Sequence, residues 1–265
     1  MKSKTQKALQ FLGSDSNITR EEIATEEPLQ ININGVPFTV AMRTPGDDLH
    51  LTRGLLFSER IIKDCAEIEN MEELYHPGES IPFAVAVRLT HFDEKEFLRT
   101  GISSSSCGMC GKKELKAARF HQGKINSKFK FEINQIKSLH DQMIQNQPLF
   151  KKTGGCHASG FYDGQYRLLC LFEDVGRHNA VDKGVGFLLD KNLVSEAKIL
   201  FLSGRISFEI LYKAYAIGIP VILAISAPSS MCIEFAEEYG ISVIGFCREN
   251  KATVYSCLDN FASKK

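Results

Sequence analysis

The residues best suited to chemistry lie in a stretch rich in serine, glycine and cysteine, 103–113. It reads S-S-S-S-C-G-M-C-G-K-K and places Cys107 and Cys110 in a C-x-x-C pair. Its low apolar content and its glycines predict an accessible loop rather than a core element. Lys112 and Lys113 begin a helical pattern, and both a helix N-terminus and nearby ammonium groups lower the pKa of a cysteine. The stretch therefore indicates thiols that react.

Three interpretations of this thiol pair stay open on spacing alone. Half of a structural zinc site would need two more ligands, and the chain has no second C-x-x-C; Cys156-His157 is the only further candidate. A thioredoxin-like redox pair should open a helix directly after a strand, which the serine run does not resemble. The third interpretation is a sulfur-relay thiol that carries a persulfide.

Length, charge and composition favour a cytoplasmic globular protein. The 265 residues suffice for one large or two modest domains. Because 32 basic side chains balance 32 acidic ones, the net charge favours neither nucleic acid nor an anionic membrane as a partner. The N-terminal residues lack a signal-like apolar core, and no run has the length of a membrane span. In a cytoplasm that keeps thiols reduced, the cysteines in or beside apolar runs are expected to be small core side chains: Cys65, Cys170, Cys232, Cys247 and Cys257.

The first half of the chain predicts a small α+β roll. Residues 1–26 are polar and are expected to pack loosely. Asn34-Gly35 lies between two alternating apolar runs, which is a strong hairpin signal. Asp47-Asp48 is expected to cap a helix over 49–60, and a strand over 83–89 follows. The predicted first domain spans 27–131 and ends in the thiol loop, with an apolar alternation over 124–131 that fits no single element.

The second half, 132–265, predicts an α/β domain. It opens with an amphipathic helix over 132–146 that Gln147-Pro148 ends. Asp163-Gly164 then predicts a hairpin. After it the predicted elements alternate: helices 179–189, 207–217 and 230–239, strands 198–202, 220–225 and 241–246, and an edge strand over 253–257. Because these strands are continuously apolar, the sheet should be covered on both faces and partly parallel.

The order of these elements is similar to that of the cytidine-deaminase-like layered fold. A zinc deaminase would carry H-x-E at the start of one helix and P-C-x-x-C at the next. Here the two positions read R-H-N-A and S-G-R-I-S. Deamination is therefore not expected, even on a shared scaffold.

Two Gly-Arg turns, Gly176-Arg177 and Gly204-Arg205, follow predicted strands and precede helices. Ligands collect at the carboxyl ends of strands in α/β sheets, where glycine admits a ligand to the backbone and arginine matches a phosphate. We expect these turns at equivalent ends of neighbouring strands, and hence a phosphate or nucleotide site. His178 fits a general acid or phosphate contact as well as a histidine bonded into a helix start.

Two further sets of polar residues have simpler interpretations. Asp182 and Lys183 are expected to pair with each other and are given no chemistry. At the end of the last long strand, Phe246 could stack on a base while Arg248 and Lys251 meet phosphates. Spacing alone favours an ordinary strand end with solvated charges there.

With these motifs placed, the chain resembles the formate dehydrogenase accessory sulfurtransferase family, FdhD (also called NarQ). The resemblance covers nearly all of the chain after the first two dozen residues. It rests on five blocks: S-S-C-G-M-C-G at 105–111, T-G-G-C-H-A at 153–158, E-D-V-G-R-H-N-A-V-D-K at 173–183, S-G-R-I-S-F-E at 203–209 and I-S-A-P-S-S at 225–230. The D-V-G-R-H-N-A block is the specific part of the match.

The resemblance implies a sulfur carrier. Such a protein takes sulfur from a cysteine desulfurase onto its C-x-x-C pair and passes it to the molybdenum (or tungsten) bis-guanine-dinucleotide cofactor of formate dehydrogenase. The persulfide would form on Cys107, while Cys110 would attack the inner sulfur or act as a second carrier. The cofactor, a bound substrate, would contact the run Phe246, Cys247, Arg248, Glu249, Asn250 and Lys251.

The resemblance also implies a deaminase-like layer with a smaller N-terminal domain, a homodimer, and no permanently bound metal. The alternative function is a cofactor-binding chaperone that does no covalent chemistry. A zinc-binding protein is the third.

Overall fold

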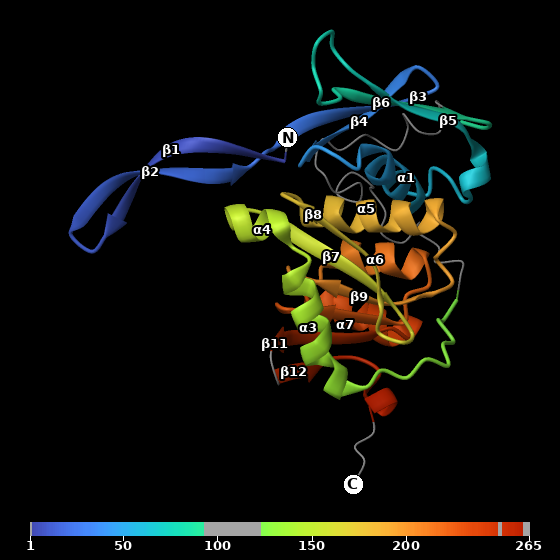
Figure 1. Ribbon diagram of the computed structural model, residues 1–265. Coiled ribbons are helices and arrows are strands. Elements are labelled where there is room, and N and C mark those ends of the chain that lie inside the picture. Colours follow the sequence, from blue (N-terminus) through green and yellow to red (C-terminus); the bar gives the residue numbers. More distant parts are fainter. Residues whose placement is uncertain (1, 93–122, 249–250, 262–265) are drawn as a thin grey trace.

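The computed structural model describes residues 2–92, 123–248 and 251–261 (Figure 1). The thiol pair Cys107 and Cys110, the helix expected from Lys113 onward, and the run members Glu249 and Asn250 lie outside these residues. The described part is a mixed α/β structure with several sheets.

A four-stranded sheet forms the first half, in the order β4-β3-β6-β5. Its strands are β3 (Glu27–Ile33), β4 (Val36–Arg43), β5 (Ile68–Leu74) and β6 (Ala84–Leu89). The predicted hairpin is confirmed, because Asn34 and Gly35 adopt φ of 50° and 84° between β3 and β4, as a tight turn of this type requires. The acid-rich edge strand β5 was not predicted. Leu29, Ile31 and Ile33 pack from β3 against the helix α1 (Asp48–Ser58).

The start of α1 differs from the prediction. Asp47 occupies the N-cap position, but with φ of 61° its side chain accepts no hydrogen bond from the helix. It forms an ion pair with Lys2 instead, at 3.0 Å. Asp48 accepts two hydrogen bonds from Arg43, at 2.9 and 3.0 Å, and both side chains are fully buried. These two carboxylates therefore serve ion pairs between elements rather than helix capping.

The N-terminal residues form a two-stranded ribbon, which was not predicted, and most of its side chains are exposed, in keeping with the predicted loose packing. Strands β1 (Ser3–Leu12) and β2 (Asp15–Ala24) pair antiparallel along their whole length, around a turn at Gly13 with φ of 65°. Figure 1 shows the ribbon projecting from the body of the molecule. Its large apolar side chains, Leu9, Phe11, Leu12, Ile18 and Ile23, are all exposed.

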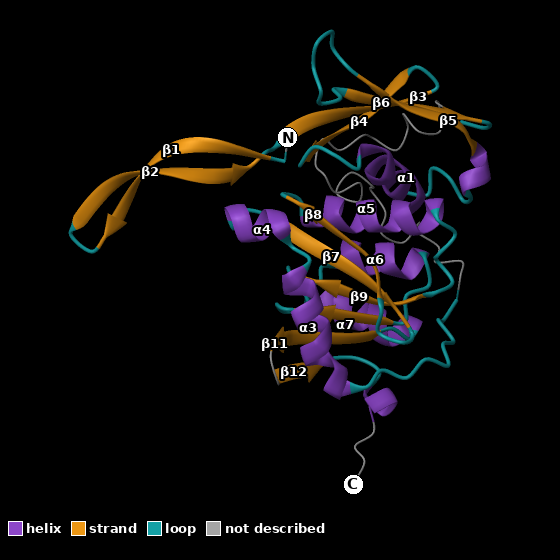
Figure 2. Ribbon diagram, viewed as in Figure 1, coloured by secondary structure: helices purple, strands orange, loops and turns teal. Residues whose placement is uncertain are grey.

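The second half is built on a six-stranded sheet in the order β12-β11-β10-β9-β7-β8 (Figure 2). Strands β9, β10 and β11 are parallel, whereas β7 runs antiparallel to both β8 and β9. The prediction of a partly parallel sheet is confirmed. The strands are β7 (His157–Asp163), β8 (Leu168–Asp174), β9 (Ala197–Leu202), β10 (Val221–Ala224), β11 (Ser242–Arg248) and the antiparallel edge β12 (Lys251–Val254).

Helices cover both faces of this sheet. On one face, α5 (Arg177–Asp190), α6 (Phe208–Ala216) and α7 (Ser230–Tyr239) share a core with Leu200 and Leu202 of β9. On the other face, α3 (Ile136–Gln145) packs against the alternate residues of the same strand. Short elements complete the chain: 3-10 helices at Cys65–Glu67, Ile133–Gln135 and Leu258–Phe261, and the helix α4 (Pro148–Thr153).

Residues 124–131, which the sequence assigned to no single element, form neither helix nor strand. The helix expected over 132–146 departs from the prediction in beginning as a 3-10 turn. On its predicted apolar side, Ile136, Leu139 and Met143 are buried, but Ile133 and Ile144 stay exposed. Of the cysteines expected in the core, Cys170, Cys232 and Cys247 are buried, whereas Cys65 and Cys257 are only partly so.

The two halves meet through helices α1 and α5, whose backbones touch. A Cβ atom on Gly54 of α1 would lie 1.9 Å from the carbonyl oxygen of Asp182, and one on Gly186 of α5 would lie 1.9 Å from that of His50. No side chain fits at either position, so the glycines allow the two helices to cross at contact distance. The boundary between residues 131 and 132 and the deaminase-like character of the layer stay predictions.

Within the described ranges, no helix is long and apolar enough to cross a lipid bilayer.

Candidate functional site

The carboxyl ends of β8, β9, β10 and β11 lie at one edge of the six-stranded sheet, which we call the carboxyl edge. This follows from the pairing, because β8 and β9 both run antiparallel to β7 while β9, β10 and β11 are parallel. Both Gly-Arg turns and Phe246 therefore lie along this edge. Such an edge is the usual place for a ligand in a sheet of this kind.

The sequence predicted that the two Gly-Arg turns follow neighbouring strands. That prediction was wrong, because β7 lies between β8 and β9. The amino end of β7 brings His157 into the gap. A Cβ atom on Gly204 would lie 3.2 Å from the His157 Nδ1 atom and 3.8 Å from the Arg177 Cδ atom. The turns are thus close in space, and glycine at position 204 leaves room for both side chains.

Arg177, the first residue of α5, carries the clearest sign of a ligand. Its side chain is partly buried, and its Nε atom is fully buried without a hydrogen-bond partner among the described residues. Buried donors in native proteins are nearly always paired, and a guanidinium pairs best with a phosphate or carboxylate. Arg205, in the other turn, is exposed. The arrangement suits an anion that approaches from the carboxyl edge.

His178 is held by the start of α6. Its Nε2 atom lies 3.4 Å from the Ser207 hydroxyl and 4.0 Å from a Glu209 carboxylate oxygen. Burial, and then the positive charges of Lys213 and Arg177, lower the pKa of His178 to about 4. Burial and Arg177 also lower the pKa of His157. A neutral imidazole beside the start of α6 fits the interpretation of His178 as a histidine bonded into a helix start. As a neutral group it can still donate a hydrogen bond to a phosphate.

Asp174 at the end of β8 shapes the first Gly-Arg turn. Its carboxylate accepts hydrogen bonds from the backbone N–H of Gly176 (2.8 Å) and the side-chain amide of Asn179 (3.0 Å). It also accepts one from the Thr44 N–H (3.1 Å), and it forms an ion pair with Lys183 (2.8 Å). The turn that presents Arg177 is therefore tied to the end of β4 in the first half.

The predicted pair of Asp182 with Lys183 does not form. Lys183 pairs with Asp174, whereas Asp182 lies 2.8 Å from Lys213 of α6 and accepts a hydrogen bond from Ser58. Consecutive helical residues point in different directions, so each side chain reaches a different neighbour. Burial raises the pKa of Asp182 despite these two partners.

At the C-terminal run, only some side chains face solvent. Phe246 has φ of 55° and is 40% exposed, and Arg248 and Lys251 are exposed. Cys247 is fully buried in the sheet core, and burial raises its pKa to about 12. Any contact of Cys247 with a ligand would therefore come from its backbone.

Cys156 has the properties of an unreactive thiol. It is buried, and its Sγ atom lies 3.5 Å from a carboxylate oxygen of Glu173. Burial, and then the Glu173 charge, raise the pKa of Cys156 to about 12. In the described part of the chain, no group of three or more His, Cys, Asp or Glu side chains is placed to hold a metal ion.

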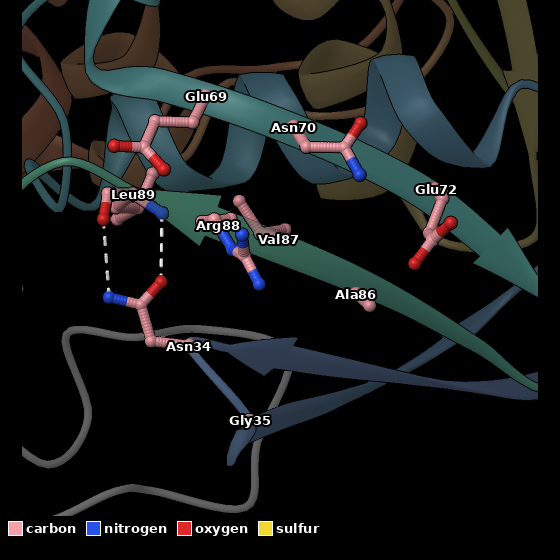
Figure 3. Close-up of a pocket in the computed structure, with 9 residues that line it drawn as sticks. All are labelled: Asn34, Gly35, Glu69, Asn70, Glu72, Ala86, Val87, Arg88 and Leu89. Carbon is pink, nitrogen blue, oxygen red and sulfur yellow. Dashed lines mark hydrogen bonds between the residues drawn. The ribbon is translucent and has the colours of Figure 1, made fainter.

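The second half and the first half of the chain each carry a pocket. One, of about 680 Å³, opens at the carboxyl edge between α3, α4 and the start of β7. The other, of about 600 Å³, lies on the four-stranded sheet (Figure 3). There the Asn34 side chain donates to the Leu89 carbonyl (3.2 Å) and accepts from its N–H (2.8 Å). These bonds fasten the end of β6 to the β3–β4 turn, just before the segment that carries the thiols.

Comparisons with known proteins agree with the motifs. The model of the FdhD/NarQ family matches residues 24–261. Proteins named sulfur carrier protein FdhD are 36% identical in Mycobacterium tuberculosis (95% of this chain, 96% of that one) and 40% identical in Sulfolobus acidocaldarius (88% of each). A solved structure from Desulfotalea psychrophila, described as a proposed formate dehydrogenase accessory protein, has a TM-score of 0.75 at 23% identity, covering 97% of this chain and 98% of that one. At that identity the likeness shows the fold alone.

Proposed function

Because the chain belongs to the FdhD/NarQ family, we propose that it is a sulfurtransferase of formate dehydrogenase maturation. It accepts persulfide sulfur from a cysteine desulfurase on the C-x-x-C pair. It then delivers the sulfur to a molybdenum (or tungsten) bis-guanine-dinucleotide cofactor, which is its bound substrate. The relatives' name, sulfur carrier protein, supports the carrier role.

The transfer needs no external oxidant. The Cys107 thiolate attacks the outer sulfur of the donor persulfide, so a new S–S bond forms on Cys107 while the donor's S–S bond breaks. The donor cysteine leaves as a thiolate. Attack of the Cys110 thiolate on the inner sulfur would then form a disulfide and release the outer sulfur at the oxidation level of sulfide. Lys112 and Lys113 favour the attacking thiolate.

The observation in the structure that best supports cofactor binding is the Nε atom of Arg177 at the carboxyl edge, which is buried and has no hydrogen-bond partner among the described residues. Phosphates of a guanine dinucleotide would supply the missing acceptor there and at Arg205. Farther along the edge, Phe246 offers an exposed ring for a base, and Arg248 and Lys251 offer positive charge. Gly204 leaves room for the His157 and Arg177 side chains beside the proposed phosphate position.

The partners that follow from this proposal are a cysteine desulfurase and formate dehydrogenase. The protein would act in the cytoplasm as a homodimer, without nucleic acid or membrane partners. Guanine nucleotide binding belongs to the same proposal and does not depend on the thiols.

Mass spectrometry tests the sulfur transfer. After incubation with a cysteine desulfurase and cysteine, the wild-type chain should gain the mass of one sulfur, and Cys107→Ala should not. An unchanged gain in Cys107→Ala would reject the assignment. If Cys107→Ala and Cys110→Ala still mature formate dehydrogenase while Arg177→Ala and Arg205→Ala do not, the protein is a cofactor-binding chaperone instead.

A further inference from the structure

The ribbon of β1 and β2 takes no part in the sulfur transfer proposed above. Side chains alternate between the two sides of a ribbon, and antiparallel partners lie on the same side. Leu9 lies opposite Ile18, so both share one side with Phe11, two residues farther along β1. All three side chains are more than half exposed. This side of the ribbon, which we call the apolar side, therefore presents a row of large apolar groups to solvent.

Two cations lie beside this row. Lys7 and Arg20 are opposite each other on the apolar side, one pair closer to the base of the ribbon. Within the described ranges, the ion pairs near the ribbon include neither of them. The next carboxylate along that side, Glu22, accepts a hydrogen bond from Ser3 and pairs with Lys152. Like charges directly opposite each other are unfavourable, so this side lacks a carboxylate that a partner could supply.

The ribbon is not a surface that folds stably by itself. A two-stranded hairpin is at best marginally stable in water unless another strand or another element packs on it. Figure 1 shows the ribbon extending away from the rest of the molecule, with its tip far from both sheets. Exposed apolar groups gathered in one patch and bordered by charge are typical of a protein–protein interaction site.

The base of the ribbon is fixed to the wall of the carboxyl edge. Lys152 of α4 lies 3.1 Å from a Glu22 carboxylate oxygen and donates to the Ser3 hydroxyl at 3.2 Å. A Cβ atom on Gly155 would lie 3.8 Å from the Ala24 Cβ atom. Gly155 and residues of α4 also line the pocket at the carboxyl edge, and Figure 1 shows α4 beside the ribbon base. A protein that binds the ribbon is therefore held on the α4 side of the carboxyl edge.

We propose that the apolar side of the ribbon is the docking surface for the protein that receives the cofactor, which is formate dehydrogenase in its cofactor-free form. The inference rests on the proposed function, because the ribbon stands beside the edge where the cofactor would bind. That position favours the acceptor of the cofactor over the donor of the sulfur. The matching surface on the partner is an apolar groove bordered by carboxylates, which would neutralise Lys7 and Arg20.

A second copy of this chain is a poorer occupant of the same surface. If two copies packed through their apolar sides about a two-fold axis, each would bring Lys7 and Arg20 into the interface. Glu22, already bonded at the base, is the only carboxylate that the described part of this side would add. Charge complementarity therefore favours a different protein.

Biolayer interferometry with immobilised cofactor-free formate dehydrogenase tests the docking surface on full-length protein. Ile18→Glu places a carboxylate in the apolar row and should weaken binding by about tenfold or more, because that charge would be buried without a partner. The matched control is Leu12→Glu. Leu12 is 62% exposed, against 67% for Ile18, and it lies on the opposite side of the ribbon. Leu12→Glu should bind like wild type.

Lys7→Glu separates docking from the stability of the ribbon. A glutamate at this position faces Arg20 and forms a cross-strand ion pair, which strengthens the ribbon. A loss of binding in Lys7→Glu therefore reports the changed charge rather than unfolding of the hairpin. The affinity for the cofactor-free enzyme should fall about threefold or more at low salt, and the difference from wild type should shrink as the salt concentration rises.

Three results would overturn the proposal. The first is equal affinity of wild type, Ile18→Glu and Leu12→Glu, or no binding by wild type. The second is weaker binding of Ile18→Glu to the cysteine desulfurase but not to the cofactor-free enzyme, since the ribbon would then dock the sulfur donor. The third is a lower mass by light scattering for Ile18→Glu than for Leu12→Glu, which would mean that the apolar side joins two copies.

Two further measurements on the same proteins report the proposed function separately. Ile18→Glu should still gain the mass of one sulfur from the desulfurase and should still bind GDP, and this result together with weaker docking supports the inference. A wild-type chain that gains no sulfur and binds no GDP would reject the proposed function, whatever the ribbon binds.

Discussion

The Lys183 ammonium group lies 2.8 Å from the Asp174 carboxylate, and both side chains are completely buried. Lys183 also donates to the Thr44 carbonyl oxygen at 2.8 Å. The ion pair thus connects α5, the end of β8 and the segment after β4. It supports the Gly-Arg turn by holding the Asp174 carboxylate, which accepts the hydrogen bond from the Gly176 N–H.

Removing the lysine should be costly. Lys183→Met leaves the Asp174 charge buried without its ion-pair partner, which should lower the free energy of unfolding by about 3–5 kcal/mol. Urea denaturation, monitored by circular dichroism, measures this loss in the free energy of unfolding. The double variant Asp174→Asn, Lys183→Met should lose less than the sum of the single losses, because the uncompensated charge is gone. Strictly additive losses would mean that the two groups do not interact.

The contact between α1 and α5 predicts a strict requirement for glycine. Gly54→Ala pushes a methyl group into the carbonyl of Asp182 and should lower the free energy of unfolding by about 1–3 kcal/mol. Gly164→Ala is the control, because its Cβ atom would lie 3.6 Å from the nearest atom, an ordinary contact. Equal midpoints of thermal unfolding for the two variants would contradict the close helix crossing.

The lowered pKa of His178 predicts how stability depends on pH. In the folded protein its pKa is about 4, against a usual value of 6.5, so the unfolded chain binds the proton more readily. Stability should therefore fall as the pH drops from about 6.5 toward 4, with His157 contributing in the same direction. In His178→Gln, urea midpoints measured at pH 7 and pH 5 should differ less than in wild type. An unchanged difference would show that His178 is not protected from protonation.

Arg177 should contribute to nucleotide affinity. Calorimetry with GDP should show that Arg177→Ala loses about 1.5–3 kcal/mol of binding free energy, the range for a charge-assisted hydrogen bond. Arg205→Ala and Arg248→Ala should also weaken binding. Arg20→Ala, on the exposed face of the ribbon, serves as the control. Identical affinities in all of these variants would place the nucleotide on another surface.

Cys156 should react slowly despite its place beside a pocket. With a pKa of about 12, almost none of its thiol is ionised at pH 8. In a time course with iodoacetamide, peptide mass spectrometry should find Cys107 alkylated well before Cys156. Cys156→Ser should still acquire the persulfide. Early labelling of Cys156 would mean that its thiol is more accessible to solvent than it is in the structure.

Local sequence signals determined much of this fold. Asn34-Gly35 specified a hairpin because a tight turn needs two residues that accept positive φ. The apolar runs at β9 and β10 predicted buried, partly parallel strands, and the bounds of α7 were predicted residue for residue. The motif blocks also identified the family. Each of these signals depends on only a few neighbouring residues, so it can be interpreted without the rest of the chain.

Only the tertiary structure decided which distant groups meet. It placed β7 between β8 and β9 and gave Asp182 and Lys183 separate partners. It also buried the Arg177 Nε atom without an acceptor among the residues that the structure describes. It also raised the pKa of Cys156 through burial and Glu173. Strand order, ion pairing and desolvation depend on contacts between residues far apart in the chain. Such contacts cannot be inferred from composition or from the spacing of nearby residues. The sequence therefore identified the candidate residues, and the packing of the folded chain determined their geometry.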